Sequence, residues 1–193
     1  YGLHFMSAHR NVYQENHFVR NGAGVAVMYS REVTMAANHF SDSWGSAAYG
    51  LLLKDISDSR IAGNVFERNS TAVTIQSSSR MTVAGNQFRG NGWALQVESS
   101  STDNVYSGNN FVGNAFDLTS NGDLATNRFE GNYWDRAELY DLDRDGVGDV
   151  PFRPLSLFAR LVDRGEDPLH RARGRVAERL AELVRRRRRR ELR

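Results

Sequence analysis

Gly63-Asn-Val-Phe66 and Gly85-Asn-Gln-Phe88 are two copies of a motif that recurs along this 193-residue chain and indicates its fold. Six copies of Asn-x-Phe recur along residues 1–134, and a small polar residue follows each Asn five positions later. The Asn residues stand at 16, 38, 64, 86, 109 and 127, so the spacings are 22, 26, 22, 23 and 18. The polar residues that follow are Asn21, Ser43, Asn69, Asn91, Asn114 and Asn132. A repeat of this length predicts stacked structural units.

A period near 22 residues fits one coil of a parallel β-helix, and the leucine pattern of a leucine-rich repeat is absent. Neighbouring coils pair their backbones at about 4.8 Å, so like residues stack on like. A buried row of Asn can donate and accept along the stack, and the Phe two positions later points to the same side. We therefore expect an all-β chain, a right-handed parallel β-helix of about six coils over residues 1–134.

Other apolar positions complete three short strands in each coil. Counting back from each Asn gives the inward pairs Leu3 and Phe5, Val25 and Val27, Leu51 and Leu53, Val73 and Ile75, and Leu95 and Val97. A third inward row holds Tyr13, Met35, Ile61, Val83 and Tyr106. Side chains between these positions point outward, because strands alternate their faces. Most aromatic and aliphatic residues are thus explained as core.

The pattern breaks after Gly131-Asn-Tyr-Trp134, whose aromatic residues suit the end of the stack. The sequence predicts an Asp-rich capping loop over residues 135–154 and an α-helical extension over residues 155–193. Its Arg-rich end, residues 171–193, holds eleven Arg and three Glu, a charge of +8, so the remaining 170 residues carry −6. A basic amphipathic helix predicts docking to a membrane surface or a polyanionic partner, and a frayed terminus is the alternative. Nucleic acid is the weaker partner, because no aromatic residue lies among the arginines.

Composition excludes several classes of protein. The chain has no Cys, which excludes disulfides, thiol catalysis and thiolate metal sites. No segment is long and apolar enough to span a bilayer. Residue 1 is Tyr within a strand-like pattern, so we expect further coils and any signal peptide upstream.

The segments that close the stack resemble proteins of the NosD family. They are Gly131-Asn-Tyr-Trp-Asp135, Tyr140-Asp-Leu-Asp-Arg-Asp-Gly-Val-Gly-Asp-Val-Pro151 and Arg153-Pro-Leu-Ser-Leu-Phe-Ala-Arg-Leu-Val-Asp163. The resemblance covers about residues 1–165 and implies a periplasmic, copper-binding β-helix that helps to mature nitrous oxide reductase. It also implies an ABC-type membrane transporter complex and a copper reductase or copper chaperone as partners. The six-Arg run at 185–190 is not part of the family pattern.

Copper ligands are suggested by two sets of outward positions in the first two coils. His17 and His39 both occupy the middle of Asn-x-Phe, so their side chains should lie about 5 Å apart. Met6 and Met28 are equivalent to each other, and His4 stands two residues before Met6. Thioether and imidazole together suit Cu(I). The alternative reading of both sets is ordinary surface residues or partner contacts, and the repeat offers no third ligand for the histidines.

Calcium is suggested by the Asp-rich loop. Asp141, Asp143, Asp145 and Asp149 match positions 1, 3, 5 and 9 of a calcium loop, with Gly146 at its sharp turn. Position 12 is Phe152, which disfavours an EF-hand and leaves a single structural loop, or a solvated acidic turn as the alternative.

Catalysis is not expected. Lyases and glycosidases of this fold use clustered carboxylates on an outer face, and the expected outward rows of the first sheet here stack no two acids. The rival to a NosD-like accessory protein is a carbohydrate-binding or carbohydrate-cleaving surface β-helix.

Overall fold

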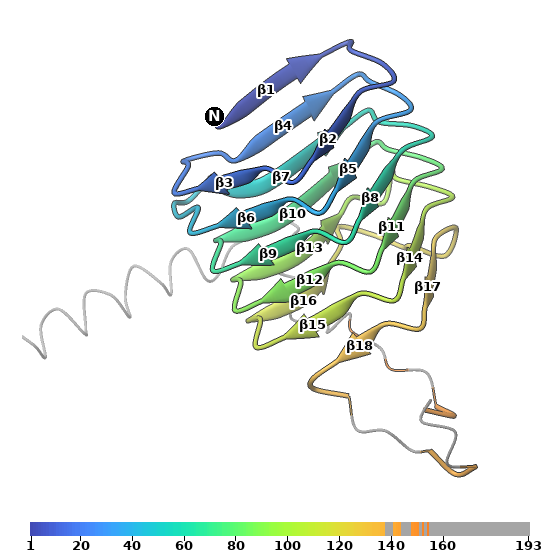
Figure 1. Cartoon of the computed structure of the whole chain (residues 1–193). Coiled ribbons are helices and arrows are strands. Elements are labelled where there is room, and N and C mark those ends of the chain that lie inside the picture. Colours follow the sequence, from blue (N-terminus) through green and yellow to red (C-terminus); the bar gives the residue numbers. More distant parts are fainter. Residues whose placement is uncertain (138–140, 144–147, 151, 153, 155–193) are drawn as a thin grey trace, which may run out of the picture.

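A computed structural model of the chain shows a parallel β-helix of six coils, which confirms the predicted all-β fold (Figure 1). It describes residues 1–137, 141–143, 148–150, 152 and 154. The predicted helical extension, residues 155–193, lies outside the described residues. In the described part of the chain, no helix is long and apolar enough to cross a membrane.

Each coil contributes one strand to each of three six-stranded sheets. Sheet A contains β1 (Leu3–Met6), β4 (Val25–Met28), β7 (Tyr49–Lys54), β10 (Thr71–Gln76), β13 (Trp93–Val97) and β16 (Phe116–Thr119). Sheet B contains β2 (Val12–Gln14), β5 (Thr34–Ala36), β8 (Arg60–Ala62), β11 (Thr82–Ala84), β14 (Val105–Ser107) and β17 (Arg128–Glu130). Sheet C contains β3 (His17–Val19), β6 (His39–Ser41), β9 (Val65–Glu67), β12 (Gln87–Arg89), β15 (Asn110–Val112) and β18 (Tyr133–Trp134).

The register between coils is constant even where the repeat length changes. The longest spacing, from Asn38 to Asn64, contains four residues more than the one before it. The strands on either side stay in register, because His39 pairs with Val65 and Val25 pairs with Leu51. The extra residues lie in the loop of residues 42–48, between β6 and β7. Insertions are thus confined to corners, and equivalent strand positions remain stacked.

The core is a closed column of stacked side chains. Phe40, Phe66, Phe88 and Phe111 are fully buried, and their rings stack at centroid distances of 4.7–5.1 Å. Trp134 extends this column at 4.1 Å from Phe111, and Phe152 lies 5.8 Å beyond it. Offset aromatic stacks of this spacing are favourable beyond the area that they bury. The aromatic column therefore continues through Trp134 in the last coil to Phe152.

A buried ladder of asparagine amides lines the turn before sheet C. Asn64 donates its backbone N–H and its Nδ2 to Oδ1 of Asn86, at 2.9 and 3.0 Å. Its Nδ2 also donates to the backbone oxygen of Met35 at 3.0 Å. Asn86 repeats this pattern with Asn109 and the oxygen of Ile61. Each side-chain amide thus pairs with backbone N–H and C=O groups at the turn of the previous coil, which would otherwise be buried without partners.

The predicted assignment of the last coil is wrong. Asn109 donates to Oδ1 of Asn132, at 2.9 and 3.0 Å, so Asn132 and not Asn127 continues the ladder. Asn127 instead accepts from Asn104 at the entry to sheet B, where Phe129 stacks on Tyr106 at 4.5 Å. The same motif therefore occurs at two turns of the coil, the one before sheet B and the one before sheet C. The spacing of the ladder after Asn109 is 23 residues, from Asn109 to Asn132. The second ladder is confirmed from Ser43 through Asn69, Asn91 and Asn114.

Candidate metal site

The outer face of sheet C carries the histidine pair. His17 on β3 pairs in register with His39 on β6, and the centroids of their rings lie 5.5 Å apart with a tilt of 56°. The following residues, Phe18 and Phe40, point into the core, so alternation along the strands turns both imidazoles outward. The His17 side chain is exposed, whereas His39 is half-buried. Two imidazoles at this separation face solvent at one end of the stack.

Glu67 is a neighbour of this pair that the repeat did not reveal. Oε1 of Glu67 lies 2.9 Å from Nε2 of His39, and 3.0 Å from the guanidinium of Arg68. Glu67 is on β9 and stands two residues after Val65, the residue that pairs with His39. The contact is therefore diagonal, on the same outer face. A search of this face for carboxylates within two positions of a stacked histidine would have found it.

Arg68 ties Glu67 to a wider ion-pair network. Its guanidinium donates to both carboxylate oxygens of Asp42, at 2.8 and 3.1 Å. This bidentate contact holds the pKa of Asp42 below its usual range, and it raises the pKa of Arg68. Bidentate Arg–carboxylate pairs fix orientation as well as charge. The Glu67 side chain, 21% exposed, is therefore held between His39 and a fixed cation.

The donor set at this place suits a transition metal. Imidazole nitrogens and a carboxylate are ligands that copper and zinc accept. Within the described residues, the ligand atoms of His17, His39 and Glu67 are not all within 4.8 Å of one another. The chemistry of these side chains therefore fits copper, but their ligand atoms do not converge on a single metal position.

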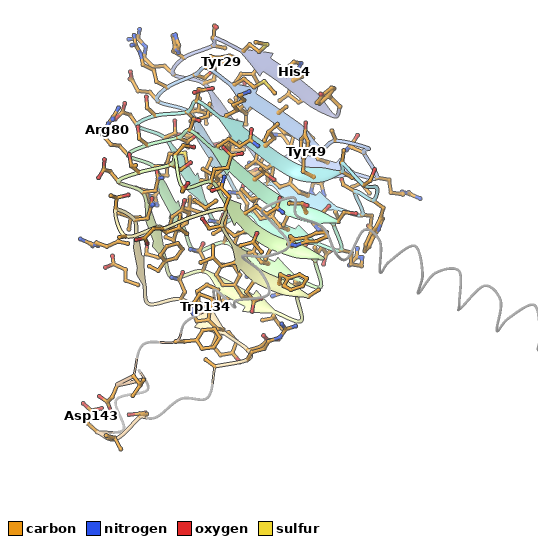
Figure 2. The ribbon with its side chains drawn as sticks, turned by 180° about the vertical axis from the view of Figure 1, so that it is seen from behind. His4, Tyr29, Tyr49, Arg80, Trp134 and Asp143 are labelled. Carbon is orange, nitrogen blue, oxygen red and sulfur yellow. The ribbon has the colours of Figure 1, made fainter. Side chains whose placement is uncertain are left out.

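The thioether pair lies on a different sheet. Met6 on β1 pairs in register with Met28 on β4, on the outer face of sheet A. His4 pairs with Ala26, so no second imidazole stacks on it, and its ring lies 5.0 Å from that of Tyr1. Figure 2 shows His4 on the outermost strand at one end of the stack. The structure thus separates the candidate copper ligands into His17 with His39, and Met6, Met28 and His4.

The acidic loop supplies a third cluster. Asp141, Asp143 and Asp149 bring three carboxylate oxygens within 4.8 Å of one another, while Asp145 lies outside the described residues. The backbone N–H of Leu142 donates to Oδ2 of Asp149 at 2.6 Å. Figure 2 shows Asp143 beyond Trp134, at the opposite end from His4. This cluster is therefore remote from both candidate copper sets, and its hard oxygen donors suit Ca²⁺.

The fold and its outward side chains define a class: a parallel β-helix protein that carries stacked imidazole and thioether side chains on its outer faces. Within that class the chain belongs to the NosD family, because the family model described as "Periplasmic copper-binding protein (NosD)" matches residues 1–139. This confirms the resemblance that the end of the stack suggested. The family is periplasmic, which supports a periplasmic location for the chain.

Two relatives share the name "Probable ABC transporter binding protein NosD". The protein from Stutzerimonas stutzeri is 30% identical over 158 residues, which cover 71% of this chain and 35% of the relative. The protein from Pseudomonas aeruginosa is 30% identical over 153 residues, which cover 69% of this chain and 34% of the relative. The chain thus matches about a third of the length of these curated relatives.

Proposed function

We propose that this chain is a non-enzymatic periplasmic protein that binds copper and supports copper-site maturation of nitrous oxide reductase. The observation that carries the proposal is the stacked, outward pair of His17 and His39 in a family described as copper-binding. An ABC-type membrane complex is the proposed partner, because the relatives are named as ABC transporter binding proteins. A copper reductase or a copper chaperone would exchange the metal with the chain.

The openness of the histidine pair supports a role in transfer. A resident cofactor is usually enclosed by a full set of ligands, whereas His17 is exposed and its donor set is not closed. A partner can approach such a site and supply or remove ligands. The Met6 and Met28 thioethers on sheet A offer softer donors suited to Cu(I). The two faces thus favour different oxidation states of copper.

Copper titration of the chain tests the proposal. The purified protein is loaded with Cu(II), or with Cu(I) under reducing conditions, then desalted, and its copper is measured by elemental analysis. We expect retention of Cu(II) by the wild type and its loss in the double variant His17→Ala plus His39→Ala. The matched variant His9→Ala, at a corner of the first coil, should retain the metal. A wild-type chain that retains neither form of copper would contradict the proposal.

The thioether set is tested in the same way. Met6→Leu plus Met28→Leu keeps the apolar volume and removes both sulfur ligands. Loss of Cu(I) alone, with Cu(II) unchanged, is the expected result.

The rival, a carbohydrate-handling β-helix, finds little support on the described strands. None of their register pairs couples two acids, as a glycosidase pair would need. Binding of the chain to acidic or neutral polysaccharide in place of copper would favour the rival.

Docking through the C-terminal extension is a separate part of the proposal. Residues 155–193 lie outside the described residues, so it rests on their apolar and Arg-rich sequence. A chain truncated after Asp163 should lose binding to the ABC-type membrane complex, and unchanged binding at low and high salt would contradict this.

A further inference from the structure

The contact between His39 and Glu67 has a chemical consequence for copper binding. We infer that Glu67 is a positioning residue: it holds the proton of the His39 ring on Nε2 and leaves Nδ1 as the atom that ligates copper. The inference rests on the proposed function, in which His17 and His39 bind copper. It adds a role for Glu67 and a choice of ligand atom.

The direction of the hydrogen bond follows from the chemistry of its two partners. An ionised carboxylate only accepts hydrogen bonds, and a neutral imidazole donates from one nitrogen and accepts at the other. Arg68 lies 3.0 Å from the same oxygen, Oε1, that contacts Nε2 of His39 at 2.9 Å. A guanidinium can only donate, so Oε1 of Glu67 acts as an acceptor in this contact. Nε2 of His39 is therefore the donor, and the lone pair of the neutral ring is at Nδ1.

The arrangement along the stack keeps the carboxylate apart from the second imidazole. Glu67 lies on β9, one coil beyond His39, whereas His17 lies on β3, one coil before it. The carboxylate and the second imidazole thus approach His39 from opposite sides. A metal shared by His17 and His39 would not compete with Glu67 for the same side of the ring.

The carboxylate itself is fixed, which a positioning role requires. Asp42 holds Arg68 through two hydrogen bonds, and Arg68 holds Glu67. Metal-binding histidines commonly donate their second ring N–H to a carboxylate, which sets the tautomer and the ring orientation. Loss of such a partner typically weakens metal binding about 10–100-fold. Asp42, Arg68 and Glu67 thus form a series of ion pairs that fixes a carboxylate next to Nε2 of His39.

The test combines a measurement without metal and one with it, both on the full chain. Nitrogen-15 NMR of the histidine side chains at neutral pH reports which ring nitrogen of His39 carries the proton. Competition with a chelator of known affinity then gives the Cu(II) affinity of the wild type, Glu67→Ala and Glu67→Gln. Glu130→Ala is the matched control, because Glu130 is also an outward carboxylate paired with an arginine, Arg128. Thermal unfolding of each variant shows whether it is folded.

We expect the Nε2–H tautomer in the wild type and a mixture of tautomers in Glu67→Ala. The Cu(II) affinity of Glu67→Ala should fall about 10–100-fold, while Glu130→Ala keeps that of the wild type. Glu67→Gln, which retains an acceptor oxygen without the charge, should lie between them. His39→Ala should bind no better than Glu67→Ala.

Two failures are distinguishable. A wild type that binds Cu(II) through His39, beside a Glu67→Ala variant of equal affinity, would overturn the role of Glu67 and leave the proposed function intact. A proton on Nδ1 of His39 in the wild type would do the same. A wild-type chain that retains no copper would overturn the proposed function and this inference with it.

Discussion

Asn38 and His39 are neighbours in the chain, but the β-helix places their side chains in opposite environments. Asn38 is 1% exposed, accepts at Oδ1 from Asn16, and donates from Nδ2 to Asn64 at 3.0 Å. His39 faces outward and contacts Glu67, a residue of a different type in the next coil. The inner amide thus hydrogen-bonds to the equivalent Asn residues of the neighbouring coils, whereas the outer imidazole contacts a carboxylate at a non-equivalent position.

This difference explains which residues repeat for structural reasons. A buried amide must find hydrogen-bond partners within the protein, and the equivalent residues of the adjacent coils supply them along the ladder. An outward side chain is satisfied by water, so the fold imposes no repetition there. A repeated outer residue, such as His17 above His39, is therefore informative about function in a way that the repeated Asn is not.

The largest expected effect comes from breaking the inner ladder at its middle. Asn86 is fully buried, and Asn86→Leu removes the acceptor of the Asn64 N–H and of one Nδ2 hydrogen of Asn64, together with the Nδ2 donor to the oxygen of Ile61. An unsatisfied buried group costs about 1–3 kcal/mol, and more than one is orphaned here, so we expect the upper part of that range. Urea denaturation measures the loss.

Gln87→Leu is the control for this variant. Gln87 is the next residue, points outward, and undergoes the same amide-to-leucine change. Its effect on the free energy of unfolding should stay within about 0.5 kcal/mol. Equal effects at positions 86 and 87 would erase the distinction between the inner and outer faces.

The same distinction explains what could be predicted from sequence. The rows through Phe40, Phe66 and Phe88 were predictable, because inward residues repeat coil by coil. The last coil was misassigned because Asn-x-aromatic occurs at the turns before both sheet B and sheet C. Asn127-Arg-Phe129, at the turn before sheet B, matches the Asn-x-Phe pattern of the ladder before sheet C. Glu67 was missed because its contact with His39 is diagonal and occurs once. Outer contacts follow from the register and the rotamers, which a repeat pattern does not specify.

Asp117 gives a smaller test, at the end of the second inner ladder. It replaces the small residue of earlier coils, such as Ala94, and its Oδ1 accepts from Nδ2 of Asn114 at 3.0 Å. Burial raises the pKa of Asp117, opposed in part by this hydrogen bond and by Arg136. A raised folded pKa means that the native state binds the proton more tightly than the unfolded state. The stability from Asp117 is therefore full below the unfolded pKa and is lost as pH rises through the folded pKa.

Asp117→Asn keeps an acceptor oxygen and removes the buried charge. We expect the variant to be more stable than the wild type at neutral pH, with the difference shrinking as the pH falls to about 4. Denaturant unfolding at several pH values measures it, and Asp123→Asn, on an exposed loop, is the control. A difference that does not change with pH would show that Asp117 has no altered proton affinity.

The smallest expected effect concerns the outer acidic cluster of Asp141, Asp143 and Asp149. Extracellular calcium modules bind with dissociation constants of about 10⁻⁴–10⁻³ M, so about 1 mM Ca²⁺ would add roughly 0.4–1.4 kcal/mol by mass action. Thermal unfolding with Ca²⁺ and with chelator should show this gain, and Asp143→Asn plus Asp149→Asn should abolish it. Asp55→Asn plus Asp103→Asn makes the same change of charge at exposed corners of the coils and should preserve the gain. If both double variants reduce the Ca²⁺-dependent gain in stability equally, Ca²⁺ acts by general screening of an acidic surface, and the Asp-rich loop is a solvated acidic turn.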